Sequence, residues 1–303
     1  MNIKELIDYT RSEILDDVIW PYNWTDLGLI TALNRAYEEL AREAWCIIDS
    51  ETASICRIPL YANQVLHTLS PKVINVFHGA ILESNGYPLF KRTESYMRRF
   101  TNWRATTGTP VLLIMDSSNR KISTYPKFDT NGYYVGSMTF QRSAGTIMFA
   151  GASFDTYVSA GDTVEISRTV YNDGVFTVVT AAPTILTVVE DLVNETGPAT
   201  GEIRLERDAA LLRVARLPLV PYTPADLALV TPPTPEMDSQ WHYGLANGIA
   251  KYAFLKPDSE TYDPQQGQRH TGIFEQFKND VKLWTLIQMS GNENQCVPDI
   301  GML

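Results

Sequence analysis

Residues 24–44 have the sequence WTDLGLITALNRAYEELAREA, in which apolar side chains recur at the 3.6-residue period of an amphipathic helix. Thr25 or Asp26 can cap the start of this helix, which we expect to end near Ile47. Charged side chains occupy the opposite face, so the helix should pack its apolar face against a protein core. The predicted buried stripe consists of Leu27, Ile30, Leu33, Tyr37, Leu40, Ala41 and Ala44.

The segment before this helix shows the same period. Residues 3–18 carry a second apolar stripe that includes Val18, and Asn2 and Glu5 have the spacing of a capping box. Pro21 cannot continue a helix, so it closes the segment. The N-terminal part of the chain is therefore predicted to be a pair of helices.

Two more helices are predicted near the other end of the chain. One runs from Asp238 to Pro257 and contains Gly244 and Gly248, each of which costs about 1 kcal/mol of helix propensity relative to alanine. These glycines indicate either the close approach of another helix backbone or plain tolerance. The last helix follows Asp263-Pro264, a cap residue and a proline at the first helical position. Its predicted stripe is Ile273, Phe274, Phe277, Val281, Trp284 and Ile287.

The middle of the chain, about 52–235, has a different composition. It is rich in Thr, Val, Tyr, Gly and Pro, and short alternating runs are broken by turn residues, which is typical of β-structure. Residues 91–104 are expected to contain a short amphipathic turn or helix, and residues 117–120 a hairpin turn. Strands are predicted at 54–59, 73–77, from about 80, and at 111–115, 121–125, 146–149, 163–167, 175–180 and 184–189.

The fold class predicted from these patterns is α+β. The two N-terminal and two C-terminal helices form a terminal four-helix bundle, which with the nearby strands gives a core domain of residues 1–135 and 208–303. The last strands recur at intervals of about 10 residues with turn chemistry between them, which indicates a small β-barrel or sandwich. This all-β module is predicted to be inserted at 136–207, since exposed loop tips accept insertions.

Composition excludes several classes of protein. The chain has 303 residues, with 25 Lys and Arg against 35 Asp and Glu, so its net charge is −10. Such an acidic chain is a poor general binder of nucleic acid, because phosphate contacts need a basic surface. No apolar run reaches the ~20 residues of a membrane span, and the N-terminus has no signal-peptide core. Cys46, Cys56 and Cys296 are therefore expected to be reduced thiols.

Catalytic and metal-binding motifs are not found. The sequence has no phosphate-binding glycine loop, no G-x-S-x-G, no H-E-x-x-H and no C-x-x-C. His67 and His78 could meet across adjacent strands as half a metal site, but a core or surface role is the favoured interpretation. The carboxylate pairs Asp16-Asp17 and Glu190-Asp191 are expected to be solvated charge. We therefore predict a non-enzyme with no catalytic residues, no cofactor and no metal.

Two segments are candidates for protein contacts. Residues 90–104 interleave basic and aromatic side chains, and we expect Arg98, Arg99, Trp103 and Arg104 to form a protein-interface patch. A nucleic-acid contact, or a helix whose arginines simply cover its own aromatics, is the alternative. The last residues, 290–303, carry apolar side chains without periodicity, which indicates either a frayed end or a segment that orders on a partner.

Three stretches together resemble one protein family. The first is ELIDYTRSEILDD (5–17) followed by WTDLGLITALNRAYEELAREA, and the second is the run from LLRVARLPLVP (211–221) to FEQFKNDVKLW (274–284). The third, AGDTVEISRTVYNDGVFTVVTAAPTILTVVEDLVNE (160–195), resembles a small β module that recurs in phage structural proteins. Taken in order, the chain is similar to the head-to-tail connector, or adaptor, proteins of tailed bacteriophages. Residues 60–105 match least.

The resemblance implies a structural virion protein at the head–tail junction, made in the cytoplasm of the host bacterium. Such adaptors form a ring of about twelve subunits that joins the portal to the tail nozzle, tube or fibre proteins, and double-stranded DNA passes through the channel without specific binding. It also implies that the C-terminal segment reaches the portal. The portal-contact residues expected on this basis are Gln295, Cys296, Val297, Pro298, Ile300, Met302 and Leu303.

Two other functions stay open from the sequence. Another phage tail or capsid accessory protein could carry the same β module, although the terminal helix pairs argue against it. A tail-associated glycan hydrolase would need two poised carboxylates in a pocket, and the sequence contains no recognisable pair.

Overall fold

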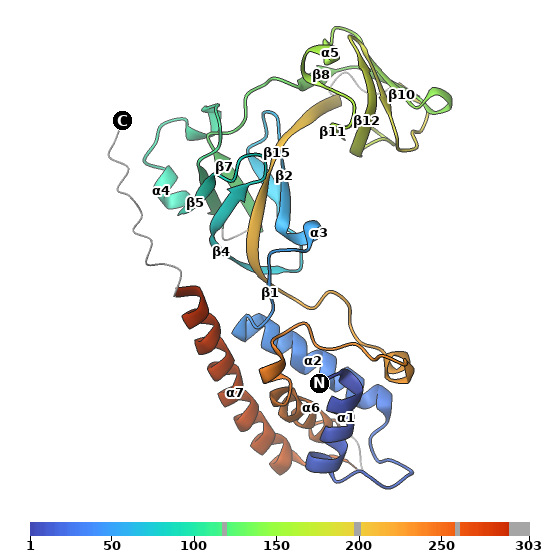
Figure 1. Ribbon diagram of the computed structural model, residues 1–303, viewed down its shortest axis with the longest axis vertical. Helices are drawn as coiled ribbons and strands as arrows, with labels where there is room; N and C mark the ends of the chain where they lie inside the picture. The colour runs from blue at the N-terminus through green and yellow to red at the C-terminus, as the bar shows by residue number, and fades with distance from the viewer. Residues whose placement is uncertain (117–119, 197–200, 258–260, 291–303) are drawn as a thin grey trace. The chain divides into compact units, whose positions relative to one another are not determined.

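The computed structural model of the protein describes residues 1–116, 120–196, 201–257 and 261–290 (Figure 1). The fold is mixed α+β, as predicted, and it contains a large sheet. The chain divides into two compact units. The helical unit comprises Met1–Ser50, Pro71–Phe77 and Val214–Leu303, and the β-rich unit comprises Glu51–Ser70 and His78–Arg213. Within the described residues, no helix combines the length and the apolar character that crossing a membrane requires.

Four helices make up most of the helical unit (Figure 1). They are α1 (Ile3–Thr10), which continues into a π-helical turn at Arg11–Leu15, α2 (Asp26–Ala44), α6 (Gly244–Phe254) and α7 (Pro264–Ser290). The predicted caps are present, because Asn2 and Glu5 form a capping box and the Thr25 hydroxyl accepts from the Gly28 N–H. All four helices contribute to one hydrophobic core that includes Leu6, Ile30, Leu33, Tyr37, Leu245, Ile249, Phe274 and Val281.

The predicted stripes are wrong at four positions. Val18, Leu27, Ile273 and Ile287 are exposed and not buried. The first helix ends at Leu15, before Val18, because Asp16 takes a left-handed conformation that a helix cannot continue through. The other three residues belong to α2 and α7, but their side chains do not face the core. The 3.6-residue period shows that a helix has a buried face, but it does not show how wide that face is.

The two glycines of α6 are sites of close packing. A Cβ atom at Gly248 would lie 2.6 Å from the Ala36 Cβ of α2 and 2.8 Å from the Phe274 ring of α7, and one at Gly244 would lie 2.1 Å from the Phe277 ring. Close approach is therefore confirmed, but the neighbouring atoms belong to side chains and not to a helix backbone as expected. These glycines let α6 pack closely against both neighbouring helices.

Gly248→Ala is expected to lower the free energy of unfolding of the helical unit by about 1–3 kcal/mol, because overpacking outweighs the gain in helix propensity. Gly272→Ala on α7 is the matched control, since nothing lies within 4 Å of a Cβ there. It should leave stability unchanged or raise it by up to about 1 kcal/mol. Urea unfolding followed by circular dichroism at 222 nm measures both variants. A stabilising Gly248→Ala would contradict the packing described here.

A network of buried charges joins α2, α6 and α7. The Glu39 carboxylate accepts from the Lys251 Nζ at 2.8 Å, from the Lys278 Nζ at 2.6 Å and from the Tyr252 hydroxyl at 2.6 Å. The Lys278 side chain is only 4% exposed and also pairs with Glu43 and Glu275. Burial alone would raise the pKa of Glu39, but the three hydrogen bonds outweigh it and lower that pKa to about 2.

Acid is expected to weaken the helical unit through Glu39. Its pKa is about 2 in the folded chain against an ordinary value of 4.5, so the unfolded chain takes up the proton first as the pH falls. The stabilisation is complete above about pH 4.5, and about 3 kcal/mol of it is lost between there and pH 2. Urea titrations at pH 7, 4 and 3 measure this slope, which Glu39→Gln should flatten. An equal acid slope in that variant would rule out Glu39 as its origin.

A second buried ion cluster centres on Arg216 in the helical unit. Its guanidinium pairs with Asp49 and with Glu236, and its Nη1 also donates to the Leu217 carbonyl oxygen at 3.1 Å. The side chains of Arg216 and Asp49 are 8% and 6% exposed. Asp49 belongs to β1 (Ile48–Asp49), which pairs antiparallel with the end of β15 (Gly201–Arg216), so the cluster ties three separate segments of the chain together.

The β-rich unit contains the other strands and three short helices. The strands join in the order β14-β9-β10-β13-β12-β11-β15-β4-β5-β6-β7-β3, and β2 and β8 pair with β15. The strands are β2 (Arg57–Tyr61), β3 (Leu66–Thr68), β4 (Val73–Leu82), β5 (Pro88–Thr93), β6 (Leu112–Asp116), β7 (Lys121–Tyr125), β8 (Tyr133–Gly136), β9 (Met138–Gln141), β10 (Thr146–Phe149), β11 (Thr163–Ser167), β12 (Gly174–Ala182), β13 (Ile185–Val188) and β14 (Glu195–Thr196). The helices are α3 (Ala53–Cys56), α4 (Glu94–Met97) and α5 (Phe154–Tyr157).

Two strand predictions in this region are wrong. Residues 54–56 belong to α3, and the strand predicted at 54–59 starts only at Arg57. The strands predicted at 73–77 and from 80 are one strand, β4, which continues through His78 and Gly79 although both have positive φ. A Cβ at Gly79 would lie 2.1 Å from the Leu89 carbonyl oxygen, so only glycine fits beside β5 at this irregular point.

The region predicted as an inserted module has its own hydrophobic core. Strands at 146–149 and 163–167 lie where they were predicted. Buried side chains from these strands and their neighbours form one cluster that includes Met138, Phe140, Ile147, Phe154, Val164, Ile166, Leu186 and Ile203. The predicted boundary at 207 falls inside β15, which pairs with β8 and β11 before this position and with β2 around and after it.

Candidate interaction surfaces

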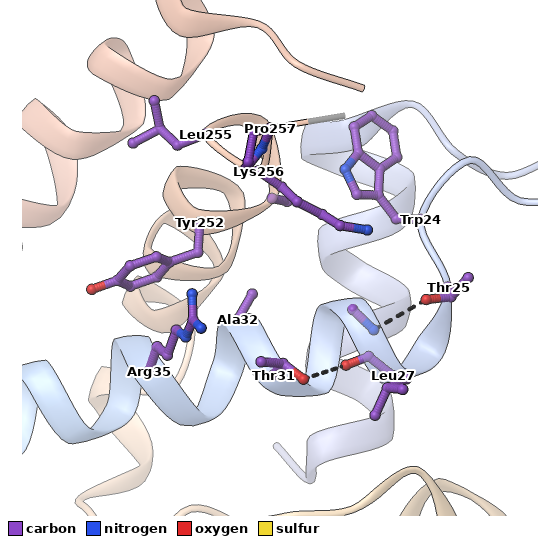
Figure 2. Close-up of a pocket in the computed structure, with 12 residues that line it drawn as sticks. Trp24, Thr25, Leu27, Thr31, Ala32, Arg35, Tyr252, Leu255, Lys256 and Pro257 are labelled. Atoms are coloured by element: carbon purple, nitrogen blue, oxygen red, sulfur yellow. Dashed lines mark hydrogen bonds between the residues drawn. The ribbon is translucent and has the colours of Figure 1, made fainter. Parts of the chain in front are cut away.

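A surface pocket of about 390 Å³ lies between α2 and α6 in the helical unit (Figure 2). Its apolar walls include Trp24, Leu27 and Leu255, and the Tyr252 ring closes one side. Arg35 and Lys256 also line it, and none of the carboxylates that the structure describes does. The pocket can therefore accept an apolar group that carries a negative charge.

The polar groups at the start of α2 are satisfied within the helix. The Thr25 hydroxyl accepts from the Gly28 N–H at 3.2 Å, and the Thr31 hydroxyl donates to the Leu27 carbonyl oxygen at 2.7 Å (Figure 2). Arg35, in contrast, makes no hydrogen bond or ion pair with any residue that the structure describes. The arginine is thus a charge available at the pocket wall.

The loop between α1 and α2, residues 16–24, is held by one buried carboxylate. Asp17 pairs with Arg11 at 2.6 Å and accepts from the backbone N–H groups of Asn23 and Trp24 at 2.8 and 3.2 Å. The Arg11 guanidinium also lies 4.2 Å from the centre of the Tyr22 ring. The expectation of solvated charge at Asp16-Asp17 is therefore wrong for Asp17, which is buried because it satisfies the turn.

This anchored loop projects apolar side chains outward. Ile19 and Trp20 are 81% and 80% exposed, and Val18 is 57% exposed. Sequence analysis missed this surface because Val18 was assigned to a buried stripe and Leu27 to another. The run DDVIWP (16–21) could have indicated this exposed surface, because three large apolar residues lie there between two carboxylates and a proline.

The basic and aromatic segment lies in the β-rich unit. Arg98, Arg99 and Arg104 are exposed, whereas Trp103 is buried against Met97 and Ile114. Arg104 stacks on the Trp103 ring at 5.1 Å and pairs with Glu94 at 2.8 Å. The exposed aromatic groups here are Tyr96 and Phe100, and the guanidinium groups of Arg92 and Arg99 lie 5.6 and 6.0 Å from the Tyr96 ring centre.

The histidines do not come together. His67 lies on β3 and His78 on β4, and β5, β6 and β7 separate these strands, so the alternative of a contact across adjacent strands is excluded. The favoured interpretation agrees with the structure, since His67 is buried and His78 is exposed. Burial lowers the pKa of His67 to about 4. Over the part of the chain that the structure describes, no three His, Cys, Asp or Glu side chains are grouped so that they could hold a metal ion.

Two further predicted sites have different outcomes. Glu190 accepts from the Thr177 backbone N–H at 2.7 Å and from its hydroxyl at 2.8 Å, which outweighs burial and lowers the pKa of Glu190. This carboxylate therefore stabilises the end of a strand pair.

The expected portal-contact residues, Gln295, Cys296, Val297, Pro298, Ile300, Met302 and Leu303, lie outside the described residues.

Comparison with known protein families indicates the family to which the chain belongs. Residues 1–293 match the family described as SU10 adaptor protein. The chain belongs to this family of phage adaptor proteins. The resemblance to phage adaptors is thereby confirmed, and an adaptor of this family is a structural phage protein that is expected to oligomerise and to bind portal and tail components. No curated protein matches the adaptor chain.

Proposed function

We propose that this adaptor forms a ring of about twelve subunits between the portal and the tail of a phage, and that the ring forms part of the DNA channel. The observation that supports this function is the family match over residues 1–293. The protein would be made in the cytoplasm of the host bacterium and would act in the virion at the head–tail junction. Its function is mechanical and requires no catalytic step.

The net charge of the chain supports the channel role. At −10, the subunit repels the phosphate backbone of DNA over most of its surface. A channel built from such subunits allows double-stranded DNA to slide, because few basic side chains are available to hold it. Transient passage of DNA without specific binding is the expected behaviour.

The architecture proposed for the subunit is the one predicted from the sequence. The helices α1, α2, α6 and α7 would form a four-helix bundle, which is supported by their shared core. Residues 136–207 would be a small β-barrel inserted into a core domain of residues 1–135 and 208–303, which is supported by a separate hydrophobic cluster. We assign the barrel to contacts with a neighbouring subunit or with tail nozzle or fibre proteins.

Two contact surfaces are proposed for the partners. Residues 290–303 would reach the portal, through Gln295, Cys296, Val297, Pro298, Ile300, Met302 and Leu303. Arg98, Arg99 and Arg104, with Arg104 held by the buried Trp103, would contact another protein. Deleting residues 290–303 should leave a folded chain that no longer binds portal, and unchanged portal binding would refute that assignment.

Electron microscopy and native mass measurement of the adaptor mixed with its portal test the main proposal. Rings of about twelve adaptor subunits on the portal are expected. Portal complexes without a closed ring, or no complex at all, would overturn it. A hydrolysis assay on bacterial envelope polymers tests the assignment as a non-enzyme, for which no turnover is expected.

A further inference from the structure

We propose that the loop of residues 16–20 of one adaptor copy docks into the pocket between α2 and α6 of a second copy. In this contact Ile19 and Trp20 fill the apolar part of the pocket, and the carboxylate of Asp16 lies toward Arg35 and Lys256. The contact rests on the proposed self-assembly of the adaptor, for which it supplies one specific interface. The second copy thus contributes the side chains that complete the pocket.

The loop has the properties of a protein-binding element. Ile19 and Trp20 are 81% and 80% exposed, and tryptophan is among the residues that contribute most to binding when an interface buries it. Asp17 ties the two ends of the loop together through Arg11 and the backbone of Asn23 and Trp24. Because the loop is already ordered, little conformational entropy is lost when it binds.

The pocket has matching properties. Its volume of about 390 Å³ lies in the range of cavities that enclose a ligand, and Trp24, Leu27 and Leu255 provide apolar walls (Figure 2). The loop of the same chain does not fill it, because Trp20 of that chain is 80% exposed. The loop that we propose to fill it therefore comes from a second copy.

The charges of the two surfaces are opposite. Arg35 and Lys256 line the pocket, and among the described residues no carboxylate lines it. The loop carries the exposed carboxylate of Asp16, and Glu13 is exposed in the preceding turn. Opposite charges across an interface select the partner and set its orientation. In a chain with net charge −10, a pocket wall that carries Arg35 is well suited to an acidic segment of another copy.

Each copy carries one loop and one pocket. A contact between two different surfaces can be repeated from copy to copy, which is the requirement for a cyclic assembly. The contact can be weak in the free chain and still form at the high local concentration of subunits on a portal. It should therefore be detected both in solution and on the portal.

Disulfide trapping tests the contact on the full-length chain. Two variants, Val18→Cys in the loop and Thr31→Cys in the pocket wall, keep the anchors Ile19 and Trp20, since Val18 is 57% exposed beside them. Both are made with Cys296→Ser, because the other two cysteines, Cys46 and Cys56, are buried. Under mild oxidation, a mixture of the two variants should give a cross-linked dimer in at least fivefold excess over either variant alone. The control pair replaces Val18→Cys by Tyr87→Cys, because Tyr87 is 64% exposed and lies in the β-rich unit. Cross-linking no greater than in that control pair would overturn the proposal.

Matched substitutions measure the contribution of each surface. Leu27→Glu places a carboxylate in the pocket, and Leu283→Glu makes the same change at a residue of similar exposure on α7, 60% against 64%. Glutamate in the first turn of α2 is compatible with folding, because it complements the helix dipole. Leu27→Glu and Trp20→Ala should each weaken association of copies at least tenfold, whereas Leu283→Glu should change it less than threefold. Equal effects of the two glutamate variants would contradict the proposal.

The outcome is separable from that of the proposed function. Rings on the portal without cross-linking between positions 18 and 31 would overturn the loop contact and leave the ring proposal standing. Cross-linking in solution without any ring on the portal would support the loop contact and overturn the ring proposal.

Discussion

Glu39→Gln is expected to lower the free energy of unfolding of the helical unit by about 3 kcal/mol. The substitution removes the charge that three donors share, and it leaves Lys251 and Lys278 buried beside a neutral amide. Breaking a buried ion pair from one side costs about 3–5 kcal/mol, because the remaining charge stays out of water. The lower end of this range applies here, since Lys278 keeps its pairs with Glu43 and Glu275.

Glu38→Gln is the matched control for this experiment. It is the adjacent residue of α2 and loses the same charge, but its pair with Arg42 is exposed, at 52% and 51% of the two side chains. Exposed pairs of this kind contribute about 0.5 kcal/mol or less. Urea unfolding at pH 7 should be followed by circular dichroism at 222 nm, which reports mainly on the long helices of this unit. A difference below about 1 kcal/mol between the two variants would show that the network is not a source of stability.

Arg216→Gln is expected to cost about 3–5 kcal/mol, the second large effect. The guanidinium pairs with two carboxylates, and its removal takes the positive charge away from Asp49, whose side chain is only 6% exposed. Arg216→Lys should recover only part of the lost stability, because the compact ammonium of lysine cannot bond to both carboxylates as the planar, forked guanidinium does. The readout is the urea midpoint of the helical signal.

Arg213→Gln is the control on the same strand. Arg213 is exposed, and the described residues give it no ion pair, so its replacement should change stability by at most about 0.5 kcal/mol. Similar losses at positions 213 and 216 would show that the strand itself tolerates no substitution here and that the ion cluster is not responsible.

The 3.6-residue apolar period and the capping residues predicted that the chain forms the four helices α1, α2, α6 and α7, because both signals are local. Thr25, Asn2 and Asp263 cap the helices they were expected to cap. The short α3 and the continuous β4 were not predictable in this way, since the conformations of His78 and Gly79 depend on how closely β5 approaches. Strand order was also outside local reasoning, because the sequence left a contact between His67 and His78 open and only the strand order excludes it.

The contact surfaces were less predictable than the helices. Arg98, Arg99 and Arg104 could be selected from composition, but the burial of Trp103 depends on tertiary contacts with Met97 and Ile114. The loop with Ile19 and Trp20 was missed because apolar residues near a helix are normally buried. Their exposure follows from the Asp17 anchor, which connects residues that are several positions apart.

The buried ammonium of Lys278 has a practical consequence for chemical labelling. Burial favours its neutral form, but hydrogen bonds to Glu275, Glu39 and Glu43 outweigh this and raise the pKa of Lys278. Acylating reagents attack only the unprotonated amine, so this lysine should remain unmodified while the helices stay packed. Its rate of acylation, followed by peptide mapping, would then report how often the helices separate in the free subunit and in assembled particles.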